Sequence, residues 1–208
     1  MPADIKVKIK VCGITNYEDA SLAVSLGAHA IGFIFADSPR QVEPAKAKAI
    51  ISDLPPFVKT VGVFVNEDLG IINNIIDSCG LDLVQLHGDE SPEICEALMP
   101  RVIKAFQLRD ESSLDNLKLY KDKVKAFLFD TYSKGKRGGT GKVFNWDLAV
   151  KGKQSDIPVI LAGGLSPSNL LAAIETVKPY AIDLNSGIED RPGKKSPQLL
   201  NKAMRLFY

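Results

Sequence analysis

Two kinds of hydrophobic pattern alternate along the whole chain. Eight short segments are rich in β-branched and aromatic residues, which is typical of strands, and amphipathic patterns of about 8–13 residues, typical of helices, lie between them. The predicted strands cover residues 5–12, 30–36, 58–65, 81–87, 102–108, 124–130, 157–163 and 180–186. The pattern therefore predicts a strand followed by a helix, repeated eight times.

Three of the helical patterns carry start signals. Asn16 precedes the first pattern, which ends at Gly27, and Ser-Pro pairs beginning at Ser91 and at Ser166 open two later ones. Asn and Ser accept hydrogen bonds from the free N–H groups of a first helical turn, and Pro is tolerated at the first position. We therefore expect helices that begin directly after Asn16, Ser91 and Ser166.

The order of the elements predicts a fold class. Most of the predicted strands are continuous apolar runs, which is typical of parallel strands covered by helices on their outer face. No linker or change of composition divides the chain, so we expect one α/β domain over residues 1–208, a (β/α)8 TIM barrel. An open doubly wound sheet is the alternative, but it would normally show GxGxxG after the first strand, where this chain has VCGITN.

Composition excludes several classes of partner. The chain has 208 residues, 45% of them hydrophobic, and its formal net charge of +1 gives no field that attracts nucleic acid or anionic lipid. No apolar run approaches the roughly 20 residues that cross a bilayer, and the first residues lack the apolar core of a signal peptide. We therefore expect a cytoplasmic protein with no nucleic-acid or membrane partner.

The three cysteines are sparse and unpaired in the sequence. They are Cys12, Cys79 and Cys95, an odd number with no CxxC motif, so neither a disulfide framework nor a structural zinc site is expected. Cys79 and Cys95 lie in helical patterns, where a buried, inert thiol is the usual role. Cys12 differs because it stands where the first predicted strand ends.

Residues 131–144, TYSKGKRGGTGKVF, form the longest connection without a predicted element. A nucleotide-binding P-loop would need Gly at position 136 and Ser or Thr at 143, but Lys136 and Val143 stand there. We interpret the segment as a flexible, glycine-hinged loop that closes over an active site.

Chemically capable residues follow the ends of the predicted strands. Barrel active sites form at the carboxyl ends of the strands, so these residues should meet at one mouth. In chain order they are Cys12, Arg40, Asn66, His87, Gln107, Asp130, Gly163 with Gly164, and Asp183 followed by Ser186 and Gly187.

Two groups of these residues are suited to anions. Glycines let a backbone approach a phosphate closely, and the loops after the seventh and eighth strands of a barrel often bind phosphate together. Gly163, Gly164, Ser186 and Gly187 therefore predict a phosphate site. Arg40 follows a proline and could bind a carboxylate or phosphate through its guanidinium group, or lie on the surface.

Cys12 and Asp130 could form a proton-transfer pair across the mouth. A thiolate can remove a proton from carbon and a carboxylic acid can donate one to oxygen, if the pKa of the thiol is lowered and that of the acid is raised. Purely structural roles for both residues remain the alternative. His87 lacks a serine partner for a triad, so we expect it to form hydrogen bonds in the mouth, and His29 to be structural.

A series of motifs resembles one enzyme family. The motifs are KVCGIT, GFIFADSPR, VGVFVN, VQLHGDE, FDT followed by GGTGKVFNW, LAGGLSPSN, and DLNSGIED followed by PGKK. In this order, and over nearly the whole chain, they resemble the phosphoribosylanthranilate isomerases of tryptophan biosynthesis. LAGG alone recurs in related phosphate-binding barrels, but the full set is specific.

The resemblance implies an Amadori rearrangement of N-(5-phosphoribosyl)anthranilate to the corresponding aminoketose, with no cofactor and no metal. Cys12 matches the general base and Asp130 the general acid. The remaining matches are Arg40 for the anthranilate carboxylate, Gly163, Gly164, Ser186 and Gly187 for the phosphate, Asp183 for orienting the intermediate, and His87 in a supporting role. The family includes both monomers and homodimers.

Two departures and two alternatives accompany the resemblance. Asn185 and Ser196 stand where relatives often have Ser and Asp. A related phosphosugar barrel enzyme, such as an indole-glycerol-phosphate synthase, would need a lysine inside the barrel, for which Lys104 is the candidate, together with glutamates at strand ends. A phosphosugar-binding barrel without catalysis is the other alternative.

Overall fold

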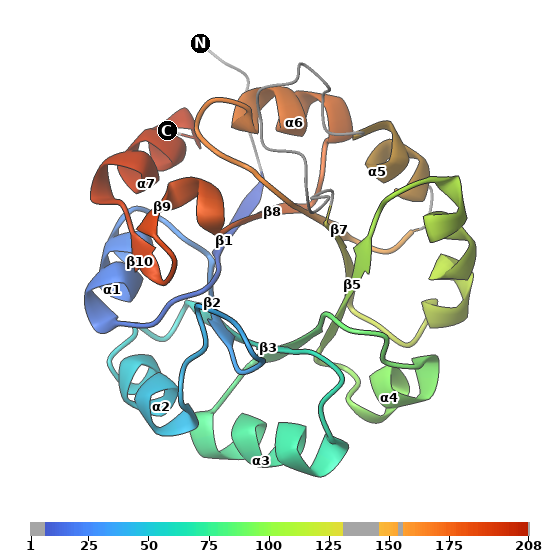
Figure 1. Ribbon diagram of the computed structural model, residues 1–208, viewed down its shortest axis with the longest axis horizontal. Coiled ribbons are helices and arrows are strands. Elements are labelled where there is room, and N and C mark those ends of the chain that lie inside the picture. The colour runs from blue at the N-terminus through green and yellow to red at the C-terminus, as the bar shows by residue number, and fades with distance from the viewer. Residues whose placement is uncertain (1–6, 131–145, 154–155, 208) are drawn as a thin grey trace.

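Eight parallel strands close into a barrel. The computed structural model describes residues 7–130, 146–153 and 156–207. Figure 1 shows the helices as an outer ring around the strands. The strands are β1 (Lys8–Val11), β2 (Ala30–Ile34), β3 (Lys59–Phe64), β4 (Leu83–Leu86), β5 (Val102–Gln107), β6 (Ala126–Asp130), β7 (Val159–Ala162) and β8 (Ala181–Leu184). Pairing of β1 with β8 closes the barrel.

A helical element follows each strand of the barrel. The α-helices are α1 (Tyr17–Ser25), α2 (Pro44–Ser52), α3 (Leu69–Cys79), α4 (Pro92–Ala97), α5 (Trp146–Gly152), α6 (Leu170–Val177) and α7 (Pro197–Met204). The 3₁₀ segments are η1 (Glu111–Tyr120), which follows β5, and η2 (Ser186–Ile188) and η3 (Arg205–Phe207). A small hairpin of β9 (Glu189–Arg191) and β10 (Lys194–Lys195) lies between β8 and α7.

The period of two along each strand separates an inner from an outer layer. Side chains of one parity, such as Val61, Leu128 and Ile160, form a cluster in the barrel interior. Side chains of the other parity pack against the helices in the larger cluster, as Phe33 and Phe127 do. A polar residue in a strand therefore faces the interior or the helices according to its parity.

The predicted fold class is confirmed, and the differences concern element ends. The first strand begins at Lys8 and the eighth at Ala181, so both are shorter than predicted. The sixth helix begins at Leu170, because the residues after Ser166 form a turn in which the Asn169 side chain accepts from the Ser166 N–H. The predicted start of the first helix is confirmed, since Asn16 accepts from the N–H of Asp19.

Three further sequence predictions concern two cysteines, the loop after the sixth strand and membrane-spanning helices. Cys79 and Cys95 are buried free thiols, as expected. The predicted closing loop at 131–144 lies outside the described residues. None of the helices in the described ranges has both the length and the apolar character to cross a bilayer.

Candidate active site

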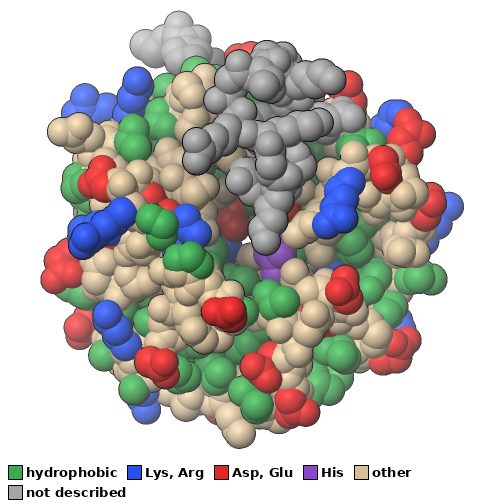
Figure 2. All heavy atoms as spheres, in the orientation of Figure 1, with side chains coloured by type: hydrophobic (Ala, Val, Ile, Leu, Met, Phe, Trp, Pro, Cys, Tyr) green, Lys and Arg blue, Asp and Glu red, His purple; other side chains and the backbone are tan. Residues whose placement is uncertain are grey.

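The predicted functional residues converge on one cavity at the carboxyl ends of the strands. Figure 2 shows the surface hollowed over the centre of the barrel. The cavity has a volume of about 310 Å³. Its lining includes eight of the nine predicted site residues, namely Cys12, Arg40, His87, Asp130, Gly163, Gly164, Asp183 and Ser186. Asn66 and Gln107, which also follow strand ends, line a separate cavity instead.

Cys12 directly follows β1 and has the parity that faces the interior. Its backbone N–H donates to the Leu184 carbonyl at 2.8 Å, which extends the β1–β8 pairing to the thiol. A Cβ at Gly32 on β2 would come within 2.8 Å of Cys12 Sγ, so the absence of a side chain there makes room for the sulfur. The thiol is 4% exposed and lines the cavity.

The surroundings of Cys12 in the protein alone do not lower the pKa of its thiol. Burial raises the pKa of the thiol, and the attraction of the nearby Lys10 ammonium only opposes that rise. A role as the base was expected to need a lowered pKa. In the protein alone, desolvation of the thiolate outweighs the neighbouring positive charges of Lys10 and Lys195.

Lys10 and Asp183 form a buried ion pair beside the cavity, which Asp183 lines. Lys10 Nζ lies 2.7 Å from Asp183 Oδ2, and the two side chains are 4% and 7% exposed. Burial alone would lower the pKa of Lys10, but Asp183 and Cys12 outweigh it, so the pKa is raised and Lys10 remains an ammonium. Asp183 Oδ1 is buried and has no hydrogen-bond partner in the part of the chain that the structure describes. An oxygen of this kind in a cavity is suited to accept a hydrogen bond from a ligand.

His87 and Asp130 face each other across the same mouth. His87 Nε2 lies 3.6 Å from Asp130 Oδ2, with the side chains 23% and 21% exposed. The other ring nitrogen, Nδ1, lies 2.9 Å from Nε2 of Gln85 on β4. His87 therefore forms the hydrogen bond in the mouth that was predicted for it. His29 accepts from the backbone N–H of Ile9, consistent with a structural role.

Arg40 is held by a partner that the sequence did not indicate. Its Nε and Nη2 groups donate to the carboxylate of Glu189 on β9 at 2.7–3.0 Å. Lys195 on β10 donates to the same carboxylate at 2.9 Å and to Asn185 Oδ1 at 3.0 Å. The Nε edge of the guanidinium is thus occupied. The edge formed by Nη1 and Nη2 has no second carboxylate partner among the described residues, and its geometry is suited to a carboxylate.

The loops after β7 and β8 pack against each other, as predicted. Gly163 and Gly164 have φ of 93° and 62°, values in the left-handed region that favour glycine. A Cβ at Gly187 would come within 2.0 Å of the Leu165 carbonyl oxygen, so only glycine permits this contact. Gly187 is the one predicted site residue that does not line the cavity, and it acts here through the packing of the two loops.

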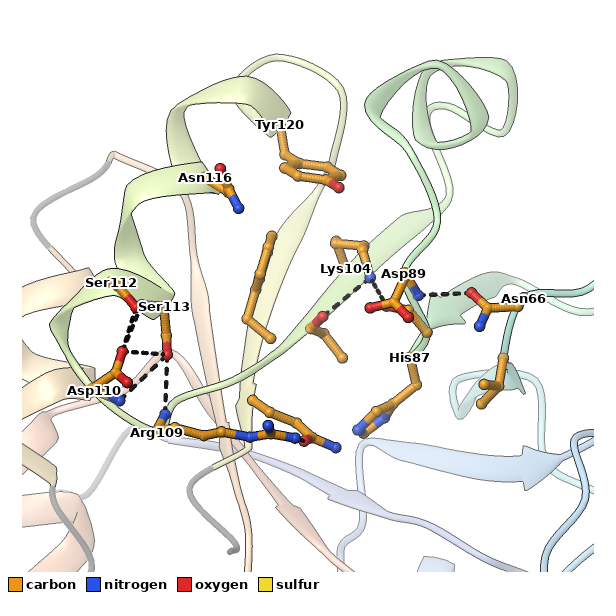
Figure 3. A pocket seen from close by; sticks show the side chains of 15 residues that line it. Asn66, His87, Asp89, Lys104, Arg109, Asp110, Ser112, Ser113, Asn116 and Tyr120 are labelled. Atoms are coloured by element: carbon orange, nitrogen blue, oxygen red, sulfur yellow. Dashed lines mark hydrogen bonds between the residues drawn. The ribbon is translucent and has the colours of Figure 1, made fainter.

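A larger cavity of about 800 Å³ lies between the ends of β3, β4 and β5 and segment η1. Of the described residues, His87 alone lines both cavities. Figure 3 shows Lys104 and His87 on one side of the larger cavity and Arg109, Asp110 and Ser113 on the other. We take the smaller cavity as the candidate active site, because the Cys12 thiol, the carboxyl groups of Asp130 and Asp183, and the glycine loops line it.

Lys104 does not face the barrel interior. Its neighbours Ile103 and Ala105 have the inner parity, and Lys104 forms a buried ion pair with Glu90 at 3.0 Å. Glu90 also accepts from the N–H groups of Asn66 and Gly88. This position does not fit the interior lysine that an indole-glycerol-phosphate synthase would need.

The described residues contain no cluster of three or more His, Cys, Asp or Glu side chains that could hold a metal ion.

The residues of the site that sequence reasoning missed are Lys10, Gln85, Glu189 and Lys195. Lys10 carried one signal, its position two residues before Cys12 on the same face of β1.

Comparison with known proteins identifies the relatives of this chain. Residues 9–205 match the sequence profile of the family described as N-(5′-phosphoribosyl)anthranilate (PRA) isomerase. The N-(5′-phosphoribosyl)anthranilate isomerases of Pelobacter propionicus and Geobacter sulfurreducens are 51% and 52% identical to it, over 96% of this chain and 95% and 97% of theirs.

Solved structures agree with the sequence relatives. The crystal structure of phosphoribosyl anthranilate isomerase from Thermotoga maritima superposes with a TM-score of 0.89, at 39% identity over 97% of this chain and 98% of the other. A phosphoribosyl anthranilate isomerase in complex with reduced 1-(o-carboxyphenylamino)-1-deoxyribulose 5-phosphate superposes with a TM-score of 0.86, at 37% identity and the same coverage.

Proposed function

Because this chain belongs to the N-(5′-phosphoribosyl)anthranilate isomerase family, we propose that Cys12 and Asp130 are the base and the acid of its reaction. The chain is an isomerase of tryptophan biosynthesis. Its reaction converts N-(5′-phosphoribosyl)anthranilate, an aminoaldose, into 1-(2-carboxyphenylamino)-1-deoxy-D-ribulose 5-phosphate, an aminoketose. The observation that carries the proposal is the single cavity lined by Cys12, Asp130 and Asp183.

The first step opens the sugar ring. Asp130 donates a proton to the furanose oxygen, the bond between that oxygen and C1 breaks, and the nitrogen lone pair forms a protonated Schiff base at C1. This intermediate carries a positive charge next to C2. The charge makes the hydrogen on C2 acidic.

The second step moves the proton. The Cys12 thiolate removes the proton from C2, the electrons of the C–H bond neutralise the Schiff base, and the resulting enolamine tautomerises to the ketone. Burial raises the pKa of Cys12 in the protein alone. The cationic Schiff base adds a second positive charge to that of Lys10, which favours the thiolate when the base is needed.

The rest of the cavity is suited to hold the two ends of the substrate apart. Arg40 offers its free guanidinium edge to the anthranilate carboxylate, and the glycine loops after β7 and β8 receive the phosphate. Asp183 Oδ1, which has no hydrogen-bond partner among the described residues, accepts a hydrogen bond from a hydroxyl of the sugar. Fixing both ends places C2 near the thiol without further cost during the reaction.

The proposal extends to the cofactor requirement, the cellular compartment and the oligomeric state. Both steps are proton transfers within one substrate, so we propose that no cofactor takes part. The three cysteines are free thiols, which suits a reducing cytoplasm. A relative from Thermotoga maritima is described as dimeric, with monomers generated from it, and we accordingly infer either a monomer or a homodimer.

The proposal is tested by removing each group separately. Cys12→Ala and Asp130→Asn should each lower kcat by about 10²–10⁴-fold, the usual contribution of a placed proton-transfer group, and change KM far less. The measurement is the fluorescence decay of freshly prepared phosphoribosylanthranilate. Cys95→Ala is the matched control, because Cys95 is fully buried and does not line the cavity.

Two outcomes would contradict these roles. Near-full turnover by Cys12→Ser would mean that a thiolate is not the base, since a hydroxyl is far less acidic. Full turnover by Asp130→Asn would remove Asp130 as the acid. A phosphosugar-binding protein without catalysis would instead bind the substrate and leave its decay unchanged.

A further inference from the structure

Three polar side chains lead from β1 toward the proposed acid on β6, and two of them, Lys10 and Gln85, are buried. Lys10 Nζ lies 2.9 Å from Gln85 Oε1, and Gln85 Nε2 lies 2.9 Å from His87 Nδ1. Beyond the ring, His87 Nε2 lies 3.6 Å from Asp130 Oδ2. Lys10, Gln85 and His87 all have the parity that faces the barrel interior.

The first contact fixes the orientation of an amide. An ammonium group can only donate hydrogen bonds, so the oxygen of the Gln85 carboxamide must face Lys10. Lys10 and Gln85 are 3% and 1% exposed, which leaves little access for a water molecule that could satisfy a reversed amide. The amide nitrogen of Gln85 is therefore directed at the His87 ring.

The second contact fixes the position of a proton on the ring. The amide NH₂ group of Gln85 can only donate, so His87 Nδ1 must accept. A neutral imidazole carries one proton, and the hydrogen bond at one nitrogen decides which nitrogen bears it. His87 consequently bears its proton on Nε2, the nitrogen that faces Asp130.

We propose that Gln85 is a positioning residue for the isomerisation: held by Lys10, it keeps the proton of His87 on Nε2, where the N–H faces Asp130. The inference rests on the proposed role of Asp130 as the acid. When Asp130 passes its proton to the ring oxygen of the substrate, it becomes a carboxylate, and His87 Nε2–H donates to the new charge. The other tautomer would present a lone pair to that carboxylate and oppose the transfer.

The two histidines of the chain provide an internal comparison. His29 Nδ1 accepts from the backbone N–H of Ile9 at 3.2 Å, and a backbone amide cannot reverse its role. His29 should therefore carry its proton on Nε2 whatever stands at position 85. In protein labelled with ¹⁵N-histidine, both neutral rings should show the Nε2–H pattern of nitrogen shifts, with the two sets assigned by a His29→Gln variant.

Gln85→Glu is the variant that separates the proposal from a structural role. Lys10 keeps an acceptor at position 85, but the carboxylate now also accepts from His87 Nδ1. We expect the His87 proton to move to Nδ1 while the His29 shifts stay unchanged. kcat should fall by about 10²-fold, the low end of what a placed proton-transfer group contributes, with little change in KM.

The matched control is Gln198→Glu, the same chemical change at an exposed position on α7. It should leave both histidine patterns and kcat unchanged. The proposal is overturned if wild-type His87 carries its proton on Nδ1, a result that needs no variant. It is also overturned if Gln85→Glu leaves the tautomer unchanged, or changes the tautomer without lowering kcat.

Failure of this inference can be distinguished from failure of the proposed acid. If Asp130→Asn keeps full turnover, Asp130 is not the acid, whatever the histidine spectrum shows. If Asp130→Asn loses turnover while Gln85→Glu keeps it, the acid stands and the positioning role of Gln85 is wrong.

Discussion

Two buried lysine–carboxylate pairs lie on opposite faces of the barrel wall, and they differ in how completely they are bonded. Lys104 and Glu90 pair on the outer face, where Lys104 also donates to backbone carbonyls and Glu90 accepts from backbone N–H groups in the loops after β3 and β4. Lys10 and Asp183 pair on the inner face, and there one carboxylate oxygen has no partner within residues 7–130, 146–153 and 156–207.

The difference shows how a buried charge can serve structure or function. A buried ion pair stabilises a protein only when its remaining donors and acceptors are also satisfied, as they are around Glu90. The unpartnered oxygen of Asp183 costs stability in the protein alone, and a ligand that donates to it recovers that cost. We therefore interpret the outer pair as part of the architecture and the inner pair as part of the site.

The sharpest test of this comparison is Glu90→Gln. The change leaves the Lys104 ammonium buried without a negative partner, so the free energy of unfolding should fall by about 3–5 kcal/mol. kcat per folded molecule should stay within about twofold of the original, because Glu90 does not line the smaller cavity. Urea unfolding followed by circular dichroism, together with the substrate-decay assay, measures both quantities.

Glu96→Gln is the control for Glu90→Gln. Glu96 pairs with Lys123 on the surface, with its side chain 64% exposed, and exposed pairs contribute little to stability. If Glu90→Gln unfolded at the same urea concentration as this control, the outer pair would not be structural. A loss of kcat at unchanged stability would place Glu90 in the active site.

The next largest effect is expected at Asp183→Asn. Asparagine can keep an oxygen facing Lys10, but its NH₂ group then replaces the unpartnered oxygen, so a donor stands where the substrate hydroxyl needs an acceptor. kcat should fall by about 10²-fold, which is about 2.7 kcal/mol. The measurement is substrate decay by protein whose folded fraction has been determined. Turnover within a few-fold of the original would show that Asp183 Oδ1 receives no hydroxyl.

The comparison also shows what the sequence alone could predict. The barrel was predictable because alternating strands and helices leave a local signal in every unit, and a barrel mouth collects the residues at strand ends. The positions of Cys12 and Asp130 at the mouth were predicted this way, and both residues line the cavity. Contacts between distant elements, such as Lys10 with Gln85, leave no local signal, because lysines alternating along a strand resemble a solvent-exposed edge.

The same limit explains why the electrostatic environment of Cys12 could not be predicted. Sequence indicated a thiol at a strand end, and chemistry indicated that a base needs a lowered pKa. The balance between burial and the charge of Lys10 depends on three-dimensional distances, and burial is the larger effect. Glu189 was missed for a related reason, since its contact with Arg40 joins loops that are far apart in the sequence.

A smaller effect distinguishes the cysteines beside the two pairs. Cys12 lies near Lys10, and Cys95 lies near Lys104, where burial raises its pKa to about 11. Only the thiolate reacts with iodoacetamide, so at pH values below the pKa of Cys12 its alkylation should become about tenfold faster per pH unit. Cys95 is fully buried and should remain unmodified.

Mass spectrometry of the peptides that contain Cys12 and Cys95, after short exposures between pH 6.5 and 9, measures these rates. Lys10→Met should slow the alkylation of Cys12, because removing the ammonium leaves burial unopposed and raises the pKa of the thiol further. A rate for Cys12 that does not change with pH would mean that its pKa is not raised in the folded protein.

The smallest expected effect concerns the ion pair of Arg40 and Glu189. Like the outer pair, its carboxylate is buried and fully bonded, and like the inner pair, it lies at the site. Glu189 is 3% exposed and binds Arg40 on one side and Lys195 on the other, while Arg40 is 20% exposed with one edge facing the site. Burial would raise the pKa of Glu189, but Arg40 and Lys195 outweigh it and hold the pKa below its usual value. The carboxylate therefore stays ionised, and Arg40 stays fixed, at neutral pH.

Glu189→Gln should loosen Arg40 without removing it. Glutamine offers one oxygen in place of a charged pair, so Arg40 loses orientation, and KM should rise by about 5- to 10-fold, or about 1 kcal/mol, with kcat nearly unchanged. Glu43→Gln, at an exposed position close to Arg40 in the sequence, is the control. The increase should disappear for a substrate analogue built on aniline, which lacks the carboxylate that we propose Arg40 binds. An equal increase for both substrates would mean that Glu189 supports the β9–β10 hairpin instead, and this pair would then belong with the structural pair on the outer face.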